Sequence, residues 1–273
     1  MQPFGGSIKQ TNMKRFGYVL SGGGARGIAH LGVLKLLEET GIQPNAIAGT
    51  SSGAIAGALY AAGKSPEEIL ELFKQHNLFG WGNIAWRKNG FFSMDVLRKL
   101  LYEAIGQEHF DGLKIKLFVA ATDLIKGHSV IFSTGNLVEA VVASASVPVV
   151  FEPVKYDDML LVDGGILNNF PAEPLKDSCD VIIGSYVNKI EKGIPNHSFL
   201  KTKNILDRCF HLAIANSAYL KVNDCDVFIE VPLHGFDMFD VKQADKIFET
   251  GYQTALQHKE KLLELKGKIL VID

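Results

Sequence analysis

Ser51 lies at the centre of a short run of small residues that has the spacing of a nucleophile elbow. The run, Gly49-Thr50-Ser51-Ser52-Gly53, matches the pattern G-x-S-x-G. A short apolar segment precedes it and a helix of small residues follows, and on such a sharp strand-to-helix turn a serine hydroxyl is held up and exposed. The start of the helix adds a positive dipole beside that hydroxyl. The alternative is a tight turn in which Ser51 or Ser52 only caps the helix.

A glycine-rich segment from Gly22 to Gly27 follows the first predicted strand. Its sequence, GGGARG, formally fits G-x-G-x-x-G, so a dinucleotide-binding fold is the obvious rival. That fold needs an acidic residue at the end of the second strand, but this strand ends at Thr50, and Glu38 and Glu39 lie earlier, inside a helix. No G-K-[ST] follows the glycines, which excludes a phosphate-binding P-loop.

The same segment can instead stabilise negative charge that develops on an oxygen. The backbone N–H groups of Gly22, Gly23 and Gly24 form an anion-binding nest at a helix start. An oxyanion hole requires such donors, fixed in place before the charge develops. Arg26 either steadies the loop or binds the carboxylate of a product, and the alternative for Arg26 is a surface ion pair. The loop alone does not decide between a phosphate and the oxygen of a reacting ester.

Asp163 is the candidate base for a serine nucleophile. It ends an apolar segment, and Gly164 and Gly165 let the backbone approach closely, although a plain Asp-Gly turn is the alternative. None of the eight histidines stands in a recognisable base motif, and His30 lies on the apolar stripe of a helix, where a core role is more common. A carboxylate with an ordinary pKa of about 4 is a poor base. Asp163 therefore needs shielding from water and a direct hydrogen bond to the serine.

The hydrophobic pattern along the chain predicts an α/β fold. Short apolar segments alternate with segments of helical spacing, which favours a mostly parallel sheet with helices on both faces. All three motifs lie beyond the ends of predicted strands, where sites form in such sheets. The predicted strands are 16–21, 45–50, 114–124, 128–135, 159–165, 179–187, 226–233 and 268–273. The predicted helices are 27–40, 52–63, one capped by Ser65, 94–105, 136–147, 206–220 and 244–265.

Composition narrows the function classes and the location. We expect residues 1–15 to be a flexible N-terminal tail and residues 16–273 to form one domain. The first fifteen residues lack the apolar core of a signal peptide, and no apolar run approaches eighteen residues, so we expect a cytoplasmic protein whose membrane contact is at most peripheral. The net charge of −2 lacks the basic field of a nucleic-acid binder. Three scattered cysteines argue against a disulfide framework or a zinc site.

Residues 78–93, LFGWGNIAWRKNGFFS, break the alternating pattern and are predicted to form an irregular loop. The segment is rich in aromatic rings and also carries two cations: Phe79, Trp81, Trp86, Phe91, Phe92, Arg87 and Lys88. One hypothesis is that part of the loop lines or covers the mouth of an acyl-chain pocket. The alternative is that most of these rings pack into the core.

The order of these motifs resembles the patatin-like phospholipase family. SGGGARG corresponds to the oxyanion loop, GTSSG to the nucleophile elbow and DGG to the segment with the catalytic aspartate, and VAATDL and ASASVPVVFEPVKYDD between them are also similar. The resemblance covers roughly residues 16–187 and more loosely the rest. The usual A-A-I-P or S-A-I-P is Ala145-Ser146-Val147-Pro148 here, which is a conservative departure.

This resemblance implies a three-layer α/β/α fold and hydrolysis of acyl esters of lipids, of the phospholipase A or lysophospholipase type, without a metal or other cofactor. Ser51 is then the nucleophile and Asp163 the proton acceptor. The remaining motif residues are Gly22, Gly23, Gly24 and Arg26 in the oxyanion loop, and the glycines Gly27, Gly49, Gly53, Gly164 and Gly165. Two rivals stay open. One is an acyltransferase, although the G-H-S-x-G motif and histidine base of malonyl-type transferases are absent, and the other is a non-catalytic nucleotide- or lipid-binding module.

Overall fold

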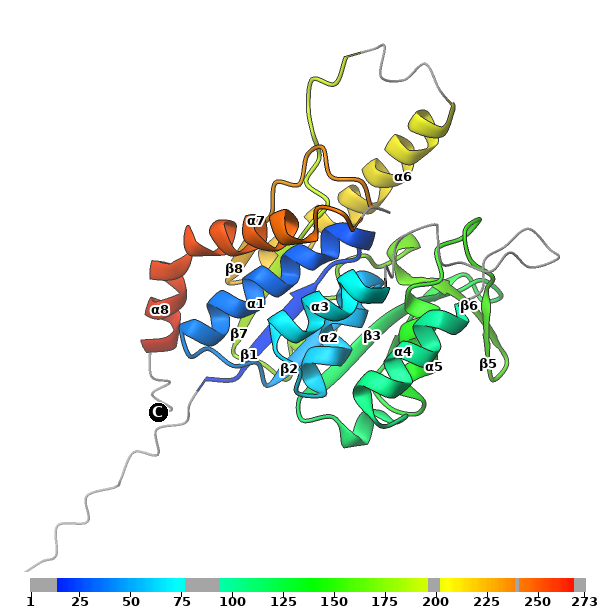
Figure 1. Ribbon diagram of the computed structural model, residues 1–273, viewed down its shortest axis with the longest axis horizontal. Helices are drawn as coiled ribbons and strands as arrows, with labels where there is room; N and C mark the ends of the chain where they lie inside the picture. The colour runs from blue at the N-terminus through cyan, green and yellow to red at the C-terminus, as the bar shows by residue number, and fades with distance from the viewer. Residues whose placement is uncertain (1–13, 77–93, 196–201, 239–240, 268–273) are drawn as a thin grey trace, which may run out of the picture.

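A mixed sheet of eight strands runs through the described part of the chain (Figure 1). The computed structural model describes residues 14–76, 94–195, 202–238 and 241–267, but not residues 1–13, 77–93, 196–201, 239–240 and 268–273. The strands are β1 (Phe16–Leu20), β2 (Ala46–Thr50), β3 (Lys116–Asp123), β4 (His128–Phe132), β5 (Val154–Tyr156), β6 (Met159–Asp163), β7 (Val181–Tyr186) and β8 (Val227–Glu230).

The strands follow the order β5-β6-β3-β2-β1-β7-β8, and β4 also pairs with β3. The five strands from β3 to β8 in this order are parallel to one another. β4, β5 and β6 pair antiparallel. The prediction of a mostly parallel sheet flanked by helices is confirmed, as is β4 as the hairpin partner of β3. The sequence analysis missed β5, which has three residues.

The described residues form eight α-helices: α1 (Ala29–Glu39), α2 (Ser52–Ala61), α3 (Pro66–His76), α4 (Asp95–Ile105), α5 (Leu137–Ser144), α6 (Thr202–Tyr219), α7 (Ala244–Leu256) and α8 (Lys259–Gly267). Short 3₁₀ turns include η1 (Gly24–Ile28) in the glycine-rich segment, η4 (Gly164–Ile166) in the DGG segment and η5 (Glu173–Leu175). Within the described ranges, no helix combines the length and the apolar character needed to cross a lipid bilayer.

Local interactions explain where the helices begin and end. Ser65 caps α3 as predicted, because its hydroxyl accepts from the Glu68 N–H while the Glu68 carboxylate accepts from the Ser65 N–H. The predicted helix over 244–265 is wrong as one element, because 3₁₀-type bonds from Gln257 to Thr254 and from His258 to Ala255 end α7. A second helix, α8, then begins at Lys259.

The two faces of the sheet are covered unequally. One face buries alternate residues such as Tyr18, Leu20 and Ile47 beneath a layer that includes α1, α2, α5 and α7, and α1 packs along α7 (Figure 1). The other face buries Val19 and Ala48 beneath the segment 170–179 and the end of α6. Burial on both faces explains why the parallel strands are nearly continuous apolar runs.

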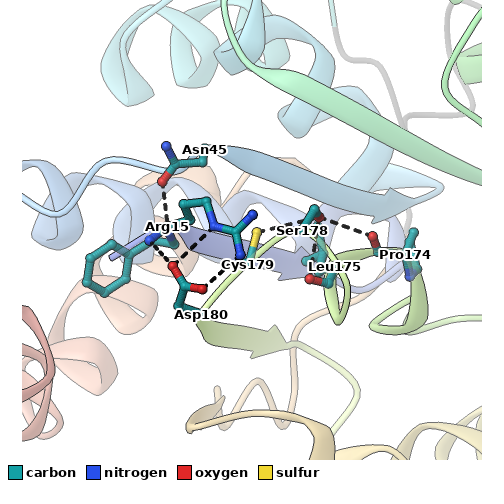
Figure 2. A network of polar contacts seen from close by, with 8 residues as sticks. Arg15, Asn45, Pro174, Leu175, Ser178, Cys179 and Asp180 are labelled. Carbon is teal, nitrogen blue, oxygen red and sulfur yellow. Dashed lines mark hydrogen bonds and ion pairs between the residues drawn. The ribbon is translucent and has the colours of Figure 1, made fainter. Parts of the chain in front are cut away.

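The start of β1 is held by a contact between Arg15 and Asp180, which Figure 2 shows. The Asp180 carboxylate accepts hydrogen bonds from the backbone N–H and the guanidinium of Arg15, at 2.8 Å for the shortest. Asn45 accepts from the Phe16 N–H at 2.8 Å and ties β1 to the start of β2. These contacts lie at the N-terminal ends of the parallel strands. They therefore stabilise the end of the sheet that is opposite to the motifs.

Candidate active site

Strand β3 exchanges one neighbour for another along its length. Its first half pairs with β2, and this pairing ends with Thr50 opposite Ala120. From Ala121 onward β3 pairs with β6, whose last residue, Asp163, lies opposite Ala121. β4 pairs with residues of both halves and therefore occupies the other edge of β3. β2 and β6 thus meet end to end on one edge, which brings the C-terminal ends of both strands together.

Ser51 forms the sharp turn between β2 and α2. Its backbone has φ 52° and ψ −122°, a left-handed conformation that a serine rarely adopts. The flanking glycines allow the close turn: a Cβ atom on Gly53 would lie 2.2 Å from the Leu20 carbonyl oxygen, and one on Gly49 would lie 2.6 Å from the Gly53 carbonyl oxygen. The Ser51 N–H donates to the Ser144 hydroxyl at 2.9 Å. The local geometry is therefore that of an elbow, but Ser51 is buried among the described residues, which differs from the exposed hydroxyl that the pattern predicts.

Asp163 is buried beside the Ser51 hydroxyl. Burial raises the pKa of the Asp163 carboxyl to about 6, and hydrogen bonds from the Ser51 side chain and the Gly165 N–H oppose this rise. The Gly165 N–H lies 2.7 Å from Asp163 Oδ1. A Cβ atom on Gly164 would lie 2.2 Å from the Ala120 carbonyl oxygen, so only glycine fits there. The structure thus shields the carboxylate from water and places it close enough to the Ser51 side chain to be affected by it.

The glycine loop lies next to the elbow and carries unused donors. A Cβ atom on Gly22 would lie 3.1 Å from Ser51 Cβ. The Gly22 N–H donates to the Asn169 carbonyl oxygen at 3.3 Å, whereas the N–H groups of Gly23 and Gly24 bond to no acceptor among the described residues. Gly24 has φ 58°, which favours glycine. Two N–H groups without an acceptor among the described residues thus directly follow Gly22, the loop residue that lies against Ser51.

Two asparagines that the sequence analysis did not single out support this loop. The Gly22 carbonyl oxygen accepts from Asn188 Nδ2 at 2.5 Å and from Asn169 Nδ2 at 3.5 Å. Both asparagines are buried. Asn169 lies six residues after Asp163 of the DGG motif, a position in the sequence that could have drawn attention to it, but nothing in the sequence points to Asn188.

Arg26 and Gly27 link the loop to neighbouring elements. Arg26 Nε donates to the Phe236 carbonyl oxygen at 2.9 Å, and its Nη1 lies 3.5 Å from His211 Nε2 on α6. A Cβ atom on Gly27 would lie 2.3 Å from Ser52 Oγ, so η1 packs directly against the start of α2. The structure therefore places Arg26 where it can steady the loop.

His30 is fully buried, and its hydrogen bonds are to Ser21 and Ser185. Its Nε2 donates to the Ser21 carbonyl oxygen at 2.8 Å, which leaves Nδ1 to accept from the Ser185 hydroxyl, also at 2.8 Å. Burial lowers the pKa of His30 to about 4, against the hydrogen bond to Ser21. His30 is thus a neutral side chain that joins α1 to β1 and β7.

Residues 78–93 fall outside the described residues. The hypothesis that this aromatic segment lines an acyl-chain pocket therefore stays a prediction.

Comparison with known proteins finds one matching family and similar sequences. Residues 18–176 match the family described as patatin-like phospholipase. An uncharacterised NTE family protein of Mycobacterium bovis is 32% identical over 189 residues, with coverage of 68% of this chain and 52% of that protein. Lysophospholipase nte1 of Aspergillus fumigatus is 26% identical over 283 residues, with coverage of 90% and 18%. The chain thus spans about half the length of the Mycobacterium relative.

Two solved structures share the fold. The crystal structure of VipD from Legionella pneumophila has a TM-score of 0.57 at 15% identity, with coverage of 92% of this chain and 68% of that chain. The crystal structure of SpcU in complex with ExoU from Pseudomonas aeruginosa has a TM-score of 0.50 at 19% identity, with coverage of 93% and 54%. At these identities the likeness concerns the fold.

Proposed function

The chain belongs to the patatin-like phospholipase family, and from this membership we propose that it hydrolyses acyl esters of lipids with a Ser51–Asp163 dyad. Ser51 is the nucleophile and Asp163 the general base. The N–H groups of Gly23 and Gly24 form the oxyanion hole, and Gly22 and Arg26 hold the loop in place. The reaction is of the phospholipase A or lysophospholipase type, and the name of the Aspergillus relative supports that class.

One observation carries the proposal: two strand ends meet on the same edge of β3. This meeting brings Ser51 at an elbow against a buried carboxylate whose pKa is about 6. A base of that pKa is largely ionised at neutral pH, and it is about a hundredfold more basic than an exposed aspartate with a pKa of about 4. The carboxylate can thus accept the proton that an ordinary aspartate would accept poorly.

The proposed reaction has two halves. Ser51 Oγ attacks the ester carbonyl carbon while its proton passes to Asp163, and the free N–H groups of the glycine loop stabilise the oxyanion that forms. Collapse breaks the bond to the alcohol oxygen, which takes the proton from Asp163, and an acyl ester remains on Ser51. Water then gives a proton to Asp163 as it attacks this ester, and the second collapse returns the proton to Ser51 and releases the carboxylic acid.

The proposed setting is one domain at a lipid surface. Elements from β1 to α8 pack around the same sheet, which supports treating residues 16–273 as a single domain. The substrate is a lipid ester, which the protein meets by peripheral contact.

The purified chain and its Ser51→Ala variant test the proposal. Lipid esters of several head groups and acyl lengths are incubated with each, and mass spectrometry identifies the products. We expect free fatty acid from the wild type alone, and a single fluorophosphonate label on Ser51. Labelling of Ser52 or Ser21 would contradict the assignment. Acyl transfer to another lipid without release of fatty acid would replace hydrolysis with transfer.

A further inference from the structure

The Ser144 hydroxyl is used as acceptor and donor at once. It accepts from the Ser51 N–H at 2.9 Å and donates to the Ala120 carbonyl oxygen at 2.6 Å. Ser144 is the last residue of α5, 93 positions along the chain from Ser51, and it is completely buried. One hydroxyl thus connects the backbone of the candidate nucleophile to the residue of β3 at which β2 ends.

The elbow needs such a connection because its conformation is unfavourable. A left-handed serine costs on the order of 1–3 kcal/mol, and it persists only where the surroundings over-determine it. A hydrogen bond to the Ser51 N–H fixes the orientation of the peptide plane that enters Ser51. This orientation, together with φ, sets the direction of the Cα–Cβ bond. Only the Ser144 hydroxyl accepts from this N–H among the described residues.

We propose that Ser144 is a positioning residue, which holds the Ser51 backbone so that Oγ points between the Asp163 carboxylate and the glycine loop. This role rests on the proposed function. Ser144 touches neither the reacting atoms nor Asp163, so it acts through the orientation of Ser51. The Ala120 carbonyl oxygen accepts from the Ser144 hydroxyl and also lies against Gly164, the residue after Asp163. The hydrogen bonds through Ser144 therefore keep the nucleophile and the base in a fixed relative position.

The effect of removing the hydroxyl follows from this geometry. In Ser144→Ala the Ser51 N–H has no acceptor in a region closed to water, and the elbow relaxes. A shift of about 1 Å at a reacting group can lower the rate about a hundredfold. We expect kcat to fall roughly ten- to a hundredfold while KM stays within about twofold, because alignment in the transition state changes and substrate binding does not.

Ser146 provides a matched control two residues away. It is also completely buried, and its hydroxyl donates to the Val142 carbonyl oxygen at 2.8 Å. Ser146→Ala therefore removes one buried hydroxyl hydrogen bond from the same segment without touching Ser51, and it keeps the backbone bond from the Asp163 N–H to the carbonyl oxygen of residue 146. Ser144→Thr is the conservative variant, because it keeps a hydroxyl at the position.

The experiment compares kcat, KM, the rate of fluorophosphonate labelling and the unfolding midpoint for wild type, Ser144→Ala, Ser144→Thr and Ser146→Ala. We expect both alanine variants to lose similar stability, but only Ser144→Ala to lose kcat and labelling rate, with recovery in Ser144→Thr. Equal kcat in the two alanine variants would overturn the positioning role while leaving the dyad intact. A wild type without hydrolytic activity would overturn the proposed function and this role with it.

Discussion

The region around Asp163 and the region around His30 contain the same pair of groups in different settings. Each has a serine hydroxyl beside a buried ionisable side chain, Ser51 beside Asp163 and Ser185 beside His30. Before burial, the histidine is the better base, since its ordinary pKa of about 6.5 exceeds the value of about 4 for aspartate. Burial disfavours the charged form of both groups, and it moves Asp163 up to about 6 and His30 down to about 4. The fold thus makes the carboxylate the stronger base.

The backbone separates the two regions further. Ser51 lies at an elbow against Gly22 of the glycine loop, and the next two N–H groups of that loop have no acceptor among the described residues. Ser185 lies within β7, between paired neighbours on both sides, and is 1% exposed. Ser185 is held in the ladder between β1 and β8, and its hydroxyl donates to His30 on α1, so it lacks the elbow that lifts a nucleophile off the strand. The difference teaches that the backbone conformation of the serine, more than the identity of the base, decides which pair can react.

Asp163→Asn gives the largest expected loss in this comparison. The substitution keeps the shape but removes the proton acceptor, and members of such a catalytic set act as a unit, so we expect kcat/KM to fall about 10³-fold or more. Steady-state hydrolysis of a soluble ester at pH 8 measures this. Activity close to that of the wild type would remove Asp163 from the mechanism.

Stability provides the control for Asp163→Asn. The folded-state pKa of Asp163 is raised, so the wild type loses stability as pH rises from about 4 to about 6, and the variant does not. The free energy of unfolding of the variant minus that of the wild type should be larger at pH 8 than at pH 4, by on the order of 2–3 kcal/mol. Loss of activity together with such a shift excludes unfolding as the cause.

Gly23→Ala should give the next largest effect. A Cβ atom there would lie 2.5 Å from Val187 Cγ2, and we expect the loop to move in response and carry its N–H away from the proposed oxyanion position. Loss of one oxyanion donor costs about 3 kcal/mol, which is about a hundredfold in kcat. Val187→Ala in the same chain should restore part of the rate by making room. A change in nucleotide affinity with unchanged hydrolysis would favour the dinucleotide interpretation of the loop. Gly24→Ala is less informative, because its Cβ would lie 2.2 Å from the Met238 carbonyl oxygen in a left-handed backbone.

The pH dependence of kcat/KM distinguishes the two bases directly. Asp163 must be ionised to accept a proton, so activity should fall about tenfold per pH unit below an apparent pKa of about 6 and stay level above it. An apparent pKa near 4 for the fall in kcat/KM would instead fit His30 or an exposed carboxylate. The apparent pKa should be the same in His30→Gln as in the wild type.

His30→Gln should have the smallest effect on activity. The substitution disturbs the hydrogen bonds to Ser21 and Ser185, and buried groups left without a partner cost about 1–3 kcal/mol each, so the unfolding midpoint should fall. At a temperature where the variant is folded, kcat/KM should stay within about fivefold of wild type, since a loss of proton transfer would cost at least about a hundredfold. A loss comparable to that of Asp163→Asn would replace the dyad with a histidine mechanism.

Local sequence signals predicted the parallel half of the sheet and the elbow. Continuous apolar runs with glycines after them mark β1 and β2, and the G-x-S-x-G spacing marks the turn at Ser51. The burial of His30 followed from the apolar stripe of its helix. These features depend on residues that are close together in the chain, which periodicity and turn chemistry describe well.

The parts that local signals missed depend on distant residues. The end-to-end meeting of β2 and β6 is a matter of register on β3, between segments more than a hundred positions apart. The contacts of Ser144 with Ser51 and of Asn188 with Gly22 span 93 and 166 positions. The presence of a single serine or asparagine in the sequence does not predict such a distant contact. The three residues of β5 are too few for a period to be read.

The rate at which a fluorophosphonate labels Ser51 tests the central claim most directly, because labelling reports activation of the nucleophile and does not depend on the identity of the lipid. Wild type, Asp163→Asn and His30→Gln are compared at pH 8 by mass spectrometry of the Ser51 peptide. The Ser51–Asp163 dyad predicts labelling that is at least about a hundredfold slower in Asp163→Asn and unchanged in His30→Gln, as expected for loss of a general base. Unchanged labelling in Asp163→Asn, with slow labelling in His30→Gln, would contradict it.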